Sequence, residues 1–480
     1  MNNDISRISL FVKKIILSGV FLFIVFLHLY YLTPGVDAGI HMYGSFLITK
    51  GLLPYKYLWN NKPPLIYVIG AIGFLLKSNP FLGVRVIELA IFSCNLFLVG
   101  KIVRAVNLRE PFLYLLTFSA IYLVSWEQGF LTETFDIPLT LAALYLLIRK
   151  IKHYELICAF LLTASFLLKQ NAVAVIAGIM LVDVFSNYRQ NNKKKKIIKY
   201  SISLLFFSLL LYLLLSRLGI WNDFIDQVFI YNIKYEDRSS FGTLIVNHIR
   251  RNSFLSVKGI STVLFFNICI LLTLWKYGKM KRDGYVFELK DWLLVNLIII
   301  YIASYYFVYM SGKSYPHYFM LLIVPATFIM GHYAAETKIG KITLGILLIV
   351  GFISNISAIP QYKKIYENRK TVVYFLKNNT PADEFIHIAG FGNQYLYVMA
   401  DRLSHTKFIL PLFENNGYTT RYKSILVNDF EKHPPLFIIL NKNNYKQLDP
   451  NNFYTEIVMK TLQRYRLVYE NELYIVYKRN

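Results

Sequence analysis

Long apolar runs constrain the fold of this 480-residue chain more than any other feature. Crossing a hydrocarbon core about 30 Å thick takes roughly 20 mostly apolar residues. The runs interpreted as spans are 15–32, 81–103, 112–126, 131–148, 156–168, 172–185, 197–215, 257–275, 292–310, 318–333 and 339–356. Charged residues make up only 17% of the chain, whereas ordinary soluble domains have about 25%. The sequence therefore predicts a polytopic α-helical membrane protein with about eleven spans, at most about twelve or thirteen.

The basic residues predict the orientation. Arg7, Lys13 and Lys14 precede the first run, and the positive-inside rule places that end in the cytoplasm. The run is too long for a signal-peptide core and no small-residue cleavage site follows it, so we expect an uncleaved first span. Across the chain, 52 Lys and Arg oppose 28 Asp and Glu, a formal net charge of +24. That excess fits cytoplasmic loops facing anionic lipid better than a nucleic-acid partner.

The run 63–76 decides the topology because it is short and begins with paired prolines. If it crossed the membrane, the basic connector 101–109 and the lysine block 193–196 would face outward, against the positive-inside rule. We therefore predict that it lies at the outer interface, within an outer loop 33–80 that contains interfacial helices. In the cell (inner or plasma) membrane, the outer side would then carry 37–62, 127–133, 169–171, 219–256, 313–317 and everything after Pro360.

The chain becomes more polar towards its C-terminus. Expected strands are 385–388, 436–440, 465–469 and 473–477, the last two forming a hairpin, and expected helices are 371–377 and 455–464. These patterns predict two domains. The first, 1–357, is transmembrane and carries the site, and the second, 358–480, is an extracytoplasmic α/β domain.

Asp37 follows the first span at the predicted lipid–water boundary. A carboxylate there could take a proton from a nucleophilic hydroxyl beside a lipid-held substrate, or it could cap the helical stretch 40–52. Lys62 precedes Pro63 and Pro64, which stiffen the backbone. Its ammonium could meet a phosphate as a point charge, or it could reach towards lipid headgroups.

Glu133 and Lys169 interrupt apolar sequence at the outer ends of predicted spans. Ionisable groups near the bilayer are costly and usually face a bundle interior or a water-filled cavity. Glu133 could position an acceptor or bind a cation, or its carboxylate could point outward to the interface. Lys169, in the turn 169–171, could serve a phosphate, or it could be one of the polar residues that a tight turn needs.

The turn 312–318 brings Lys313, His317 and Tyr318 together directly before an apolar run. Lysine and histidine can donate hydrogen bonds to a departing phosphate, although a lone interfacial histidine is commonly structural. The motifs of metalloproteases, P-loop ATPases, α/β-hydrolases and Rossmann dehydrogenases do not occur in the sequence. The ionisable residues of the outer face are therefore the candidates for chemistry.

Six short motifs on this face carry a family resemblance. They are Asp37-Ala38-Gly39, Gly51-x-x-Pro54-Tyr55, Asn61-Lys62-Pro63-Pro64, Thr132-Glu133, Leu168-Lys169-Gln170 and His317-Tyr318-Phe319. In this order they resemble the bacterial GT-C glycosyltransferases, in particular the family of protein O-mannosyltransferases and lipid A aminoarabinose transferases. The resemblance covers the whole predicted membrane region.

The resemblance implies a hexosyl or pentosyl transferase of the cell envelope. Such an enzyme moves a sugar from a polyprenyl-phosphate carrier to a lipid, glycan or protein acceptor on the outer leaflet, typically with inversion. It implies that Asp37 activates the acceptor as a general base and that Glu133 lines the acceptor or sugar pocket. It also implies phosphate-binding roles for Lys62, Lys169, His317 and Lys313, and a substrate pocket with Tyr55, Gln170 and Tyr318. Displacing a phosphate needs an aligned nucleophile, a base and cationic groups near the departing charge.

Two positions depart from the family pattern, because Ala38 and Asn61 stand where related enzymes often carry a second acidic residue. The departure leaves the acceptor and any metal requirement open. Relatives are often independent of metals, so we expect no obligatory cofactor, with a divalent cation as the alternative. Cys94, Cys158 and Cys269 lie in apolar stretches without metal-ligand spacing and are interpreted as packing residues.

Two other functions compete with the transferase. A flippase or transporter of a lipid-linked glycan would also bring charges against a phosphate, but such proteins commonly show repeats and broken helices at the midplane. A scaffold that binds partners through its outer domain would have no clear use for ionisable residues gathered on one face. Substituting Asp37 separates these classes, because a flippase or a scaffold should tolerate asparagine there.

Overall fold

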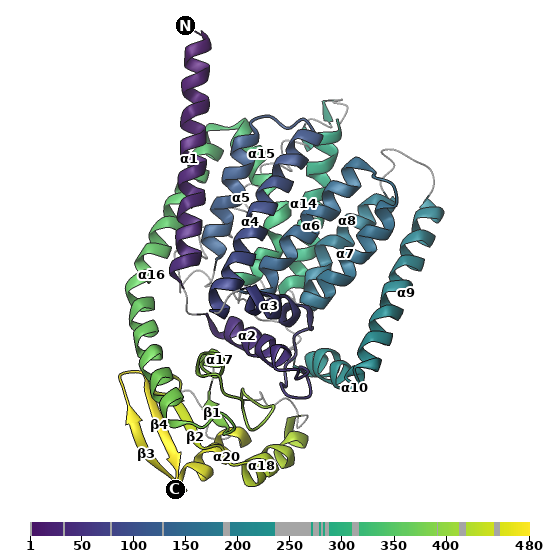
Figure 1. Cartoon of the computed structure of the whole chain (residues 1–480). Coiled ribbons are helices and arrows are strands. Elements are labelled where there is room, and N and C mark those ends of the chain that lie inside the picture. Colours follow the sequence, from purple (N-terminus) through teal and green to yellow (C-terminus); the bar gives the residue numbers. More distant parts are fainter. Residues whose placement is uncertain are drawn as a thin grey trace.

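The structure is a computed structural model that describes residues 2–31, 34–76, 79–126, 129–185, 193–235, 270–271, 278–279, 282–283, 288–309, 316–390, 392–411, 419–445 and 452–480. The part that precedes the C-terminal domain contains α1 (Asn2–Tyr30), α2 (Val36–Thr49), α3 (Leu65–Leu76), α4 (Pro80–Ala105), α5 (Pro111–Ser125), α6 (Thr132–Arg149), α7 (Tyr154–Leu168), η1 (Gln170–Ala172), α8 (Val173–Phe185), α9 (Lys193–Arg217), α10 (Trp221–Phe224), η2 (Ile225–Ile230), α11 (Tyr231–Tyr235), α14 (Leu289–Tyr309), η3 (Pro316–Leu322), α15 (Ile323–Glu336) and α16 (Lys338–Asn379). Most of these helices pack side by side in one bundle (Figure 1).

Many of these helices coincide with predicted apolar runs. In the described part of the chain, six are long and apolar enough to cross a membrane: Phe11–Tyr30, Pro80–Ala105, Lys193–Arg217, Leu289–Phe307, His317–Glu336 and Lys338–Asn379. Shorter apolar helices are Leu65–Leu76, Pro111–Ser125, Tyr154–Leu168 and Gln170–Phe185. The prediction of a mostly helical, polytopic membrane protein is therefore confirmed. The predicted run 257–275 lies almost entirely outside the described residues.

The short helices α2 and α3 lie across the end of the bundle that also carries the C-terminal domain (Figure 1). α3 has only 12 residues, about 18 Å of helix, which is too short for hydrocarbon about 30 Å thick. Its length supports the interfacial position predicted for 63–76. The other end of the bundle carries the N-terminus and the connections from α4 to α5 and from α6 to α7 (Figure 1). There Lys13 pairs with Glu110 at 2.7 Å, and Lys150 pairs with the buried Asp183.

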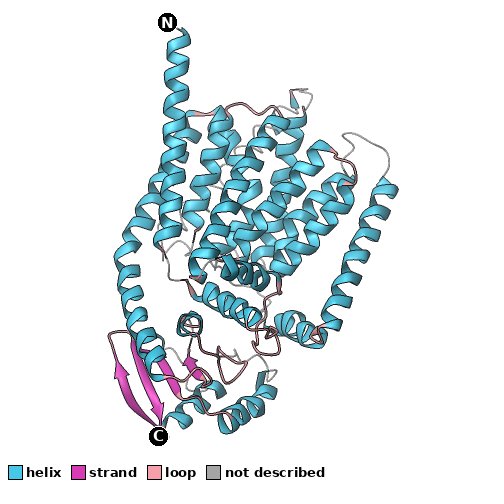
Figure 2. Cartoon of the chain, viewed as in Figure 1, coloured by secondary structure: helices cyan, strands magenta, loops and turns pink. Residues whose placement is uncertain are grey.

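The C-terminal domain contains a four-stranded sheet in the order β1-β2-β4-β3. Its elements are β1 (Ile386–Ala389), α17 (Tyr395–Ala400), η4 (Thr419–Tyr422), α18 (Lys423–Lys432), β2 (Phe437–Asn441), α19 (Lys442–Tyr445), α20 (Phe453–Leu462), β3 (Tyr465–Glu470) and β4 (Tyr474–Arg479). β1 and β2 are parallel, whereas β4 pairs antiparallel with β2 and β3, which confirms the predicted strands and hairpin. Figure 2 shows the strands confined to this domain.

α16 is a single helix that runs from the bundle into the C-terminal domain (Figure 1). The predicted helix 371–377 is its last part, and the expected domain boundary after residue 357 falls inside it. The two parts of the chain are thus joined by continuous helix, without a linker between them.

One apolar core connects the bundle end with the C-terminal domain. Buried side chains of α2 and α3, such as Tyr43 and Ile66, belong to the same cluster as Tyr395 of α17 and Phe437 of β2. The packing of α17 on α2 is close, since a Cβ on Gly39 would lie 3.3 Å from the backbone nitrogen of Tyr395. Burial of apolar surface contributes about 25 cal/mol per Å², so α2 is held firmly between the bundle and the C-terminal domain.

Candidate active site

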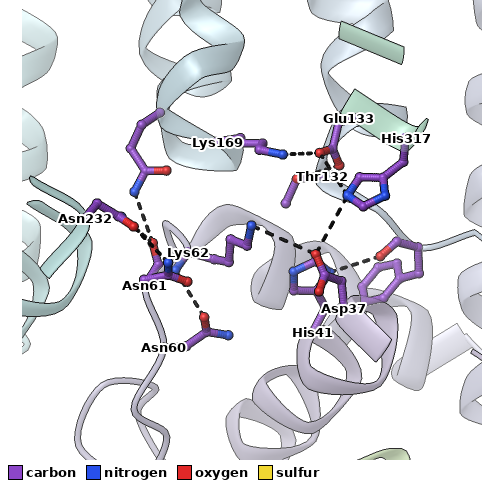
Figure 3. Close-up of polar contacts among 12 residues, drawn as sticks. Asp37, His41, Asn60, Asn61, Lys62, Thr132, Glu133, Lys169, Asn232 and His317 are labelled. Carbon is purple, nitrogen blue, oxygen red and sulfur yellow. Dashed lines mark hydrogen bonds and ion pairs between the residues drawn. The ribbon is translucent and has the colours of Figure 1, made fainter. Parts of the chain in front are cut away.

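Asp37 is the second residue of α2, and the N-cap of that helix is Gly35, which makes no side-chain cap hydrogen bond. The interpretation of Asp37 as the cap is therefore wrong. Its Oδ2 lies 4.0 Å from Lys62 Nζ and 4.0 Å from His317 Nε2 (Figure 3). About a third of its side chain, 34%, is exposed, so this carboxylate can be approached from outside the protein.

Glu133 and Lys169 form a buried ion pair (Figure 3). Glu133 lies in the first turn of α6, and Lys169 directly follows the last residue of α7. Thr132 Oγ1 donates a hydrogen bond of 2.9 Å to the second carboxylate oxygen of Glu133. Only 3% of the Glu133 side chain is exposed, so the outward-pointing alternative for this residue is wrong. Glu133 faces the protein interior and has its charge compensated there.

His317 lies between the two carboxylates. Its Nε2 is 3.9 Å from Glu133 Oε1 and 4.0 Å from Asp37 Oδ2. The ring of Tyr318 stands edge-on to the imidazole, with 5.0 Å between ring centroids, and Lys169 Nζ lies 3.5 Å from the Tyr318 ring centre. A cation over an aromatic face is attracted by the ring quadrupole. Tyr318 therefore contacts both His317 and Lys169.

These contacts define what we call the polar cluster: Asp37, Lys62, Glu133, Lys169 and His317. Burial opposes the charged form of Asp37, but Lys62, His317 and His41 hold the pKa of its carboxyl below the ordinary value. Burial lowers the pKa of Lys169 to about 8, although the Glu133 carboxylate opposes that shift. The cluster thus combines an accessible carboxylate, kept ionised, with the ammonium group of Lys62 and the imidazole of His317, each 4.0 Å from it.

His41 is a neighbour of the site that sequence reasoning missed. Burial lowers the pKa of its imidazole to about 4, so the ring is neutral at pH 7. Its Nδ1 lies 3.0 Å from the carbonyl oxygen of Phe130. Because a carbonyl only accepts, Nδ1 carries the proton. The sequence does contain one indication of its position, because the spacing of Asp37 and His41 places both residues on one face of α2.

A second buried pair fixes the turn that leads into α6. Arg85 Nη1 donates to Glu88 Oε2 at 2.6 Å, Arg85 Nη2 donates to the Tyr31 carbonyl at 2.8 Å, and the Phe130 amide donates to Glu88. Gly129 in this turn has φ +69°, and a Cβ there would lie 1.8 Å from Arg85 Nη1. Only glycine fits both the conformation and the space. The network joins the ends of α1 and α4 to the start of the helix that carries Glu133.

The remaining predicted residues contact the segment that presents Lys62, or lie outside the described chain. The Tyr55 hydroxyl donates to the Lys62 carbonyl at 2.8 Å, and Gln170 Nε2 donates to the Asn61 carbonyl at 3.0 Å. Lys313 is not among the described residues. Within the ranges that the structure describes, no three His, Cys, Asp or Glu side chains are grouped so that they could hold a metal ion.

Comparison with proteins of known structure shows a similarity in fold. No protein-family profile matches the sequence, and no curated protein is significantly similar to it. The crystal structure of ArnT from Cupriavidus metallidurans bound to undecaprenyl phosphate is similar with a TM-score of 0.62, 10% identity and 97% of each chain covered. Arabinofuranosyltransferase AftD from Mycobacteria gives a TM-score of 0.49 at 12% identity, over 97% of this chain and 40% of that one.

The Archaeoglobus fulgidus oligosaccharyltransferase, in complex with Zn and sulfate, gives a TM-score of 0.48 at 12% identity, over 96% of this chain and 73% of that one. At such low identities the likeness concerns the fold. The match to ArnT carries the comparison, because its TM-score of 0.62 is the highest of the three and it covers 97% of both chains. This chain therefore has the same overall fold as ArnT, as its resemblance to the GT-C glycosyltransferases predicted.

Proposed function

We propose that this protein is an integral-membrane glycosyltransferase that moves a sugar from a polyprenyl-phosphate carrier to a lipid, glycan or protein acceptor. The polar cluster is the observation that carries the proposal. It places the accessible Asp37 carboxylate 4.0 Å from both Lys62 Nζ and His317 Nε2, at the bundle end where α2 and α3 lie. The ArnT structure, which shares this fold, holds undecaprenyl phosphate, and this supports a polyprenyl carrier here.

The proposed reaction is a single displacement with inversion at the anomeric carbon. The oxygen of an acceptor hydroxyl attacks that carbon while its bond to the carrier phosphate oxygen breaks. Asp37 takes the hydroxyl proton as the new bond forms. The polyprenyl phosphate departs with one additional negative charge, and a nearby ammonium group stabilises that charge as it develops. Asp37 and Lys62 supply the base and the cation.

The two lysines of the polar cluster have different proposed roles. Lys62 keeps 18% of its side chain exposed, whereas Lys169 is almost fully buried against Glu133 and the Tyr318 ring. We therefore assign direct contact with the carrier phosphate to Lys62. Lys169 adds positive potential behind it, His317 is a further candidate hydrogen-bond donor to the phosphate, and Glu133 orients both of them. Lys313 stays a proposed phosphate ligand on sequence grounds alone.

We place the polar cluster and the C-terminal domain on the outer side of the cell membrane, with the N-terminus in the cytoplasm. The basic residues near the N-terminal end of the bundle, including Lys13 and Lys150, support that orientation through the positive-inside rule. The C-terminal domain packs directly on α2, so we propose that it borders the path by which the acceptor approaches Asp37.

The rate of transfer is expected to fall as the pH rises through about 8. Burial lowers the pKa of Lys169 to about 8, so its ammonium loses a proton in that range and leaves the Glu133 carboxylate uncompensated. Lys169→Arg should shift this decline to higher pH, because a guanidinium stays protonated. Initial rates between pH 6 and 10 check the prediction. An unchanged alkaline decline in the arginine variant would assign it to another group.

A donor panel tests the proposed function. Purified protein in liposomes is supplied with labelled polyprenyl-phosphate sugars and a cell-envelope extract as acceptor. Transfer of label from one donor to an acceptor is the expected result, and it also identifies the sugar. Movement of the labelled carrier between leaflets, without transfer from any donor, would favour the flippase alternative. The position of the polar cluster at one end of the bundle, away from its middle, argues against that outcome.

A further inference from the structure

The backbone on both sides of Lys62 is fixed by side chains from three other segments of the chain. The Asn61 carbonyl accepts hydrogen bonds from Gln170 Nε2 at 3.0 Å and from Asn232 Nδ2 at 3.1 Å. A carbonyl oxygen has two lone pairs, so this acceptor is saturated. On the other side, the Lys62 carbonyl accepts from the Tyr55 hydroxyl at 2.8 Å. The position of the Lys62 Cα is thereby determined from two directions.

Asn232 is the centre of this arrangement (Figure 3). Its Nδ2 donates to the carbonyls of Asn61 and Val228, the latter at 2.8 Å, and its Oδ1 accepts from Asn61 Nδ2 at 2.8 Å. Gln170 Nε2 donates to the same two carbonyls, at 3.0 Å each. Three amide side chains therefore close one hydrogen-bonded junction, which we call the amide junction: Asn61, Gln170 and Asn232.

The amide junction connects the two lysines of the polar cluster. Asn61 directly precedes Lys62, and Gln170 directly follows Lys169. A shift of either segment would change the separation of the two ammonium groups of the polar cluster, Lys62 beside Asp37 and Lys169 beside Glu133. The junction therefore lies where it can set the spacing of the charged groups without touching a substrate itself.

The segment that precedes Asn232 is locally unusual. η2 is a π-helix of six residues, and such turns are rare and occur frequently at functional sites. Gln227 in this turn is buried, accepts from the Asn60 amide at 3.0 Å and donates to the Tyr55 carbonyl at 3.1 Å. Gln227 of the π-helix thus holds the backbone at both Tyr55 and Asn60, in the loop that leads to Lys62.

We propose that Asn232 is a positioning residue for Lys62 and acts through the amide junction. The inference rests on the proposed transferase function, in which Lys62 meets the carrier phosphate. Misplacing a catalytic group by about 1 Å can lower a rate about 100-fold. Removing the Asn232 side chain should therefore lower kcat between about 10-fold and 100-fold, while the KM for the carrier changes little because the lysine itself remains.

A matched variant separates positioning from a general loss of stability. Asn355 on α16 is buried, whereas Asn232 is partly buried, and Asn355 Nδ2 likewise donates to two backbone carbonyls, Leu123 at 3.0 Å and Gly351 at 2.7 Å, far along the chain from the junction. Asn232→Ala and Asn355→Ala each remove two bonds from a side-chain amide to backbone carbonyls, and Asn232→Ala also removes the bond that Asn232 Oδ1 accepts from Asn61. Both should lower the Tm in detergent to a similar degree, and only Asn232→Ala should lower kcat.

Hydrogen exchange gives a second measurement that does not depend on turnover. The Lys62 amide donates to Asn60 Oδ1 at 3.3 Å, and the Asn60 amide donates to Gln227. Peptides covering 55–62 should exchange faster in Asn232→Ala than in the wild type, and at the wild-type rate in Asn355→Ala. Gln170→Ala, which removes the other donor to the Asn61 carbonyl, should reproduce the effect if Asn232→Ala does not fold.

Each outcome decides the inference. Faster exchange of 55–62 together with a lower kcat supports it. Wild-type exchange in both Asn232→Ala and Gln170→Ala overturns it, and so does faster exchange with an unchanged kcat. If the wild type transfers no sugar from any donor, the proposed function fails, and the exchange rates still decide whether the junction holds the Lys62 segment.

Discussion

Replacing Asp37 with asparagine is expected to lower the rate of sugar transfer by about 10²- to 10⁴-fold, the usual range for the loss of a general base. Asparagine keeps the size of the side chain but cannot take the proton of the acceptor hydroxyl. It also removes the negative partner that lies 4.0 Å from both Lys62 Nζ and His317 Nε2. Initial rates at saturating carrier, with carrier binding measured separately, check the prediction.

Asp401→Asn provides the matched control. Asp401 is an exposed carboxylate of the C-terminal domain that pairs with Lys50 at 2.9 Å. Its φ of 55° lies in the left-handed region, which asparagine tolerates. This variant should transfer sugar at the wild-type rate. If Asp37→Asn transferred equally well, Asp37 would have no part in the chemistry, and the base would have to be sought elsewhere.

Replacing Lys169 with methionine is expected to destabilise the protein by about 3–5 kcal/mol, because it leaves the buried Glu133 charge without its closest partner. Methionine is of similar length and keeps the contact with the Tyr318 ring, so loss of packing contributes little. Thermal unfolding in detergent, followed for the variant and the wild type, measures the effect.

The double variant Lys169→Met/Glu133→Gln tests the cause of that loss. It removes both charges, so most of the stability should return, while transfer should remain impaired because the positive potential that Lys169 adds behind Lys62 is gone. A double variant as unstable as Lys169→Met alone would show that the ion pair is not what the single substitution disrupts. In that case His317, 3.9 Å from Glu133, would be the next partner to replace.

The outline of the site could be predicted from the sequence, because ionisable residues that interrupt apolar runs are rare and have few alternative uses. Asp37, Lys62, Glu133, Lys169 and His317 do converge at one end of the bundle. Their pairing could not be predicted. Each of them has several possible partners of opposite charge, and only the packing of α2, α6, α7 and η3 selects among these.

Residues with local backbone roles were the hardest to predict. Tyr55 and Gln170 were expected in a substrate pocket, but their polar atoms bind carbonyls of the segment that presents Lys62. Nothing in the sequence indicated a role for Asn232, since a single amide residue in a polar stretch belongs to no periodic pattern and no motif. Whether an amide side chain meets a carbonyl depends on the direction of both groups in space, which no local pattern encodes.

The sequence by itself determined the class of the protein, most of its helices and the C-terminal hairpin. The reason is that burial in lipid and pairing of strands impose patterns on neighbouring residues. Only the tertiary structure decided that α16 continues into the C-terminal domain, that α2 is packed between that domain and the bundle, and which charges meet in the polar cluster. These features depend on contacts between residues far apart in the chain, where side-chain shape and direction select one partner among many.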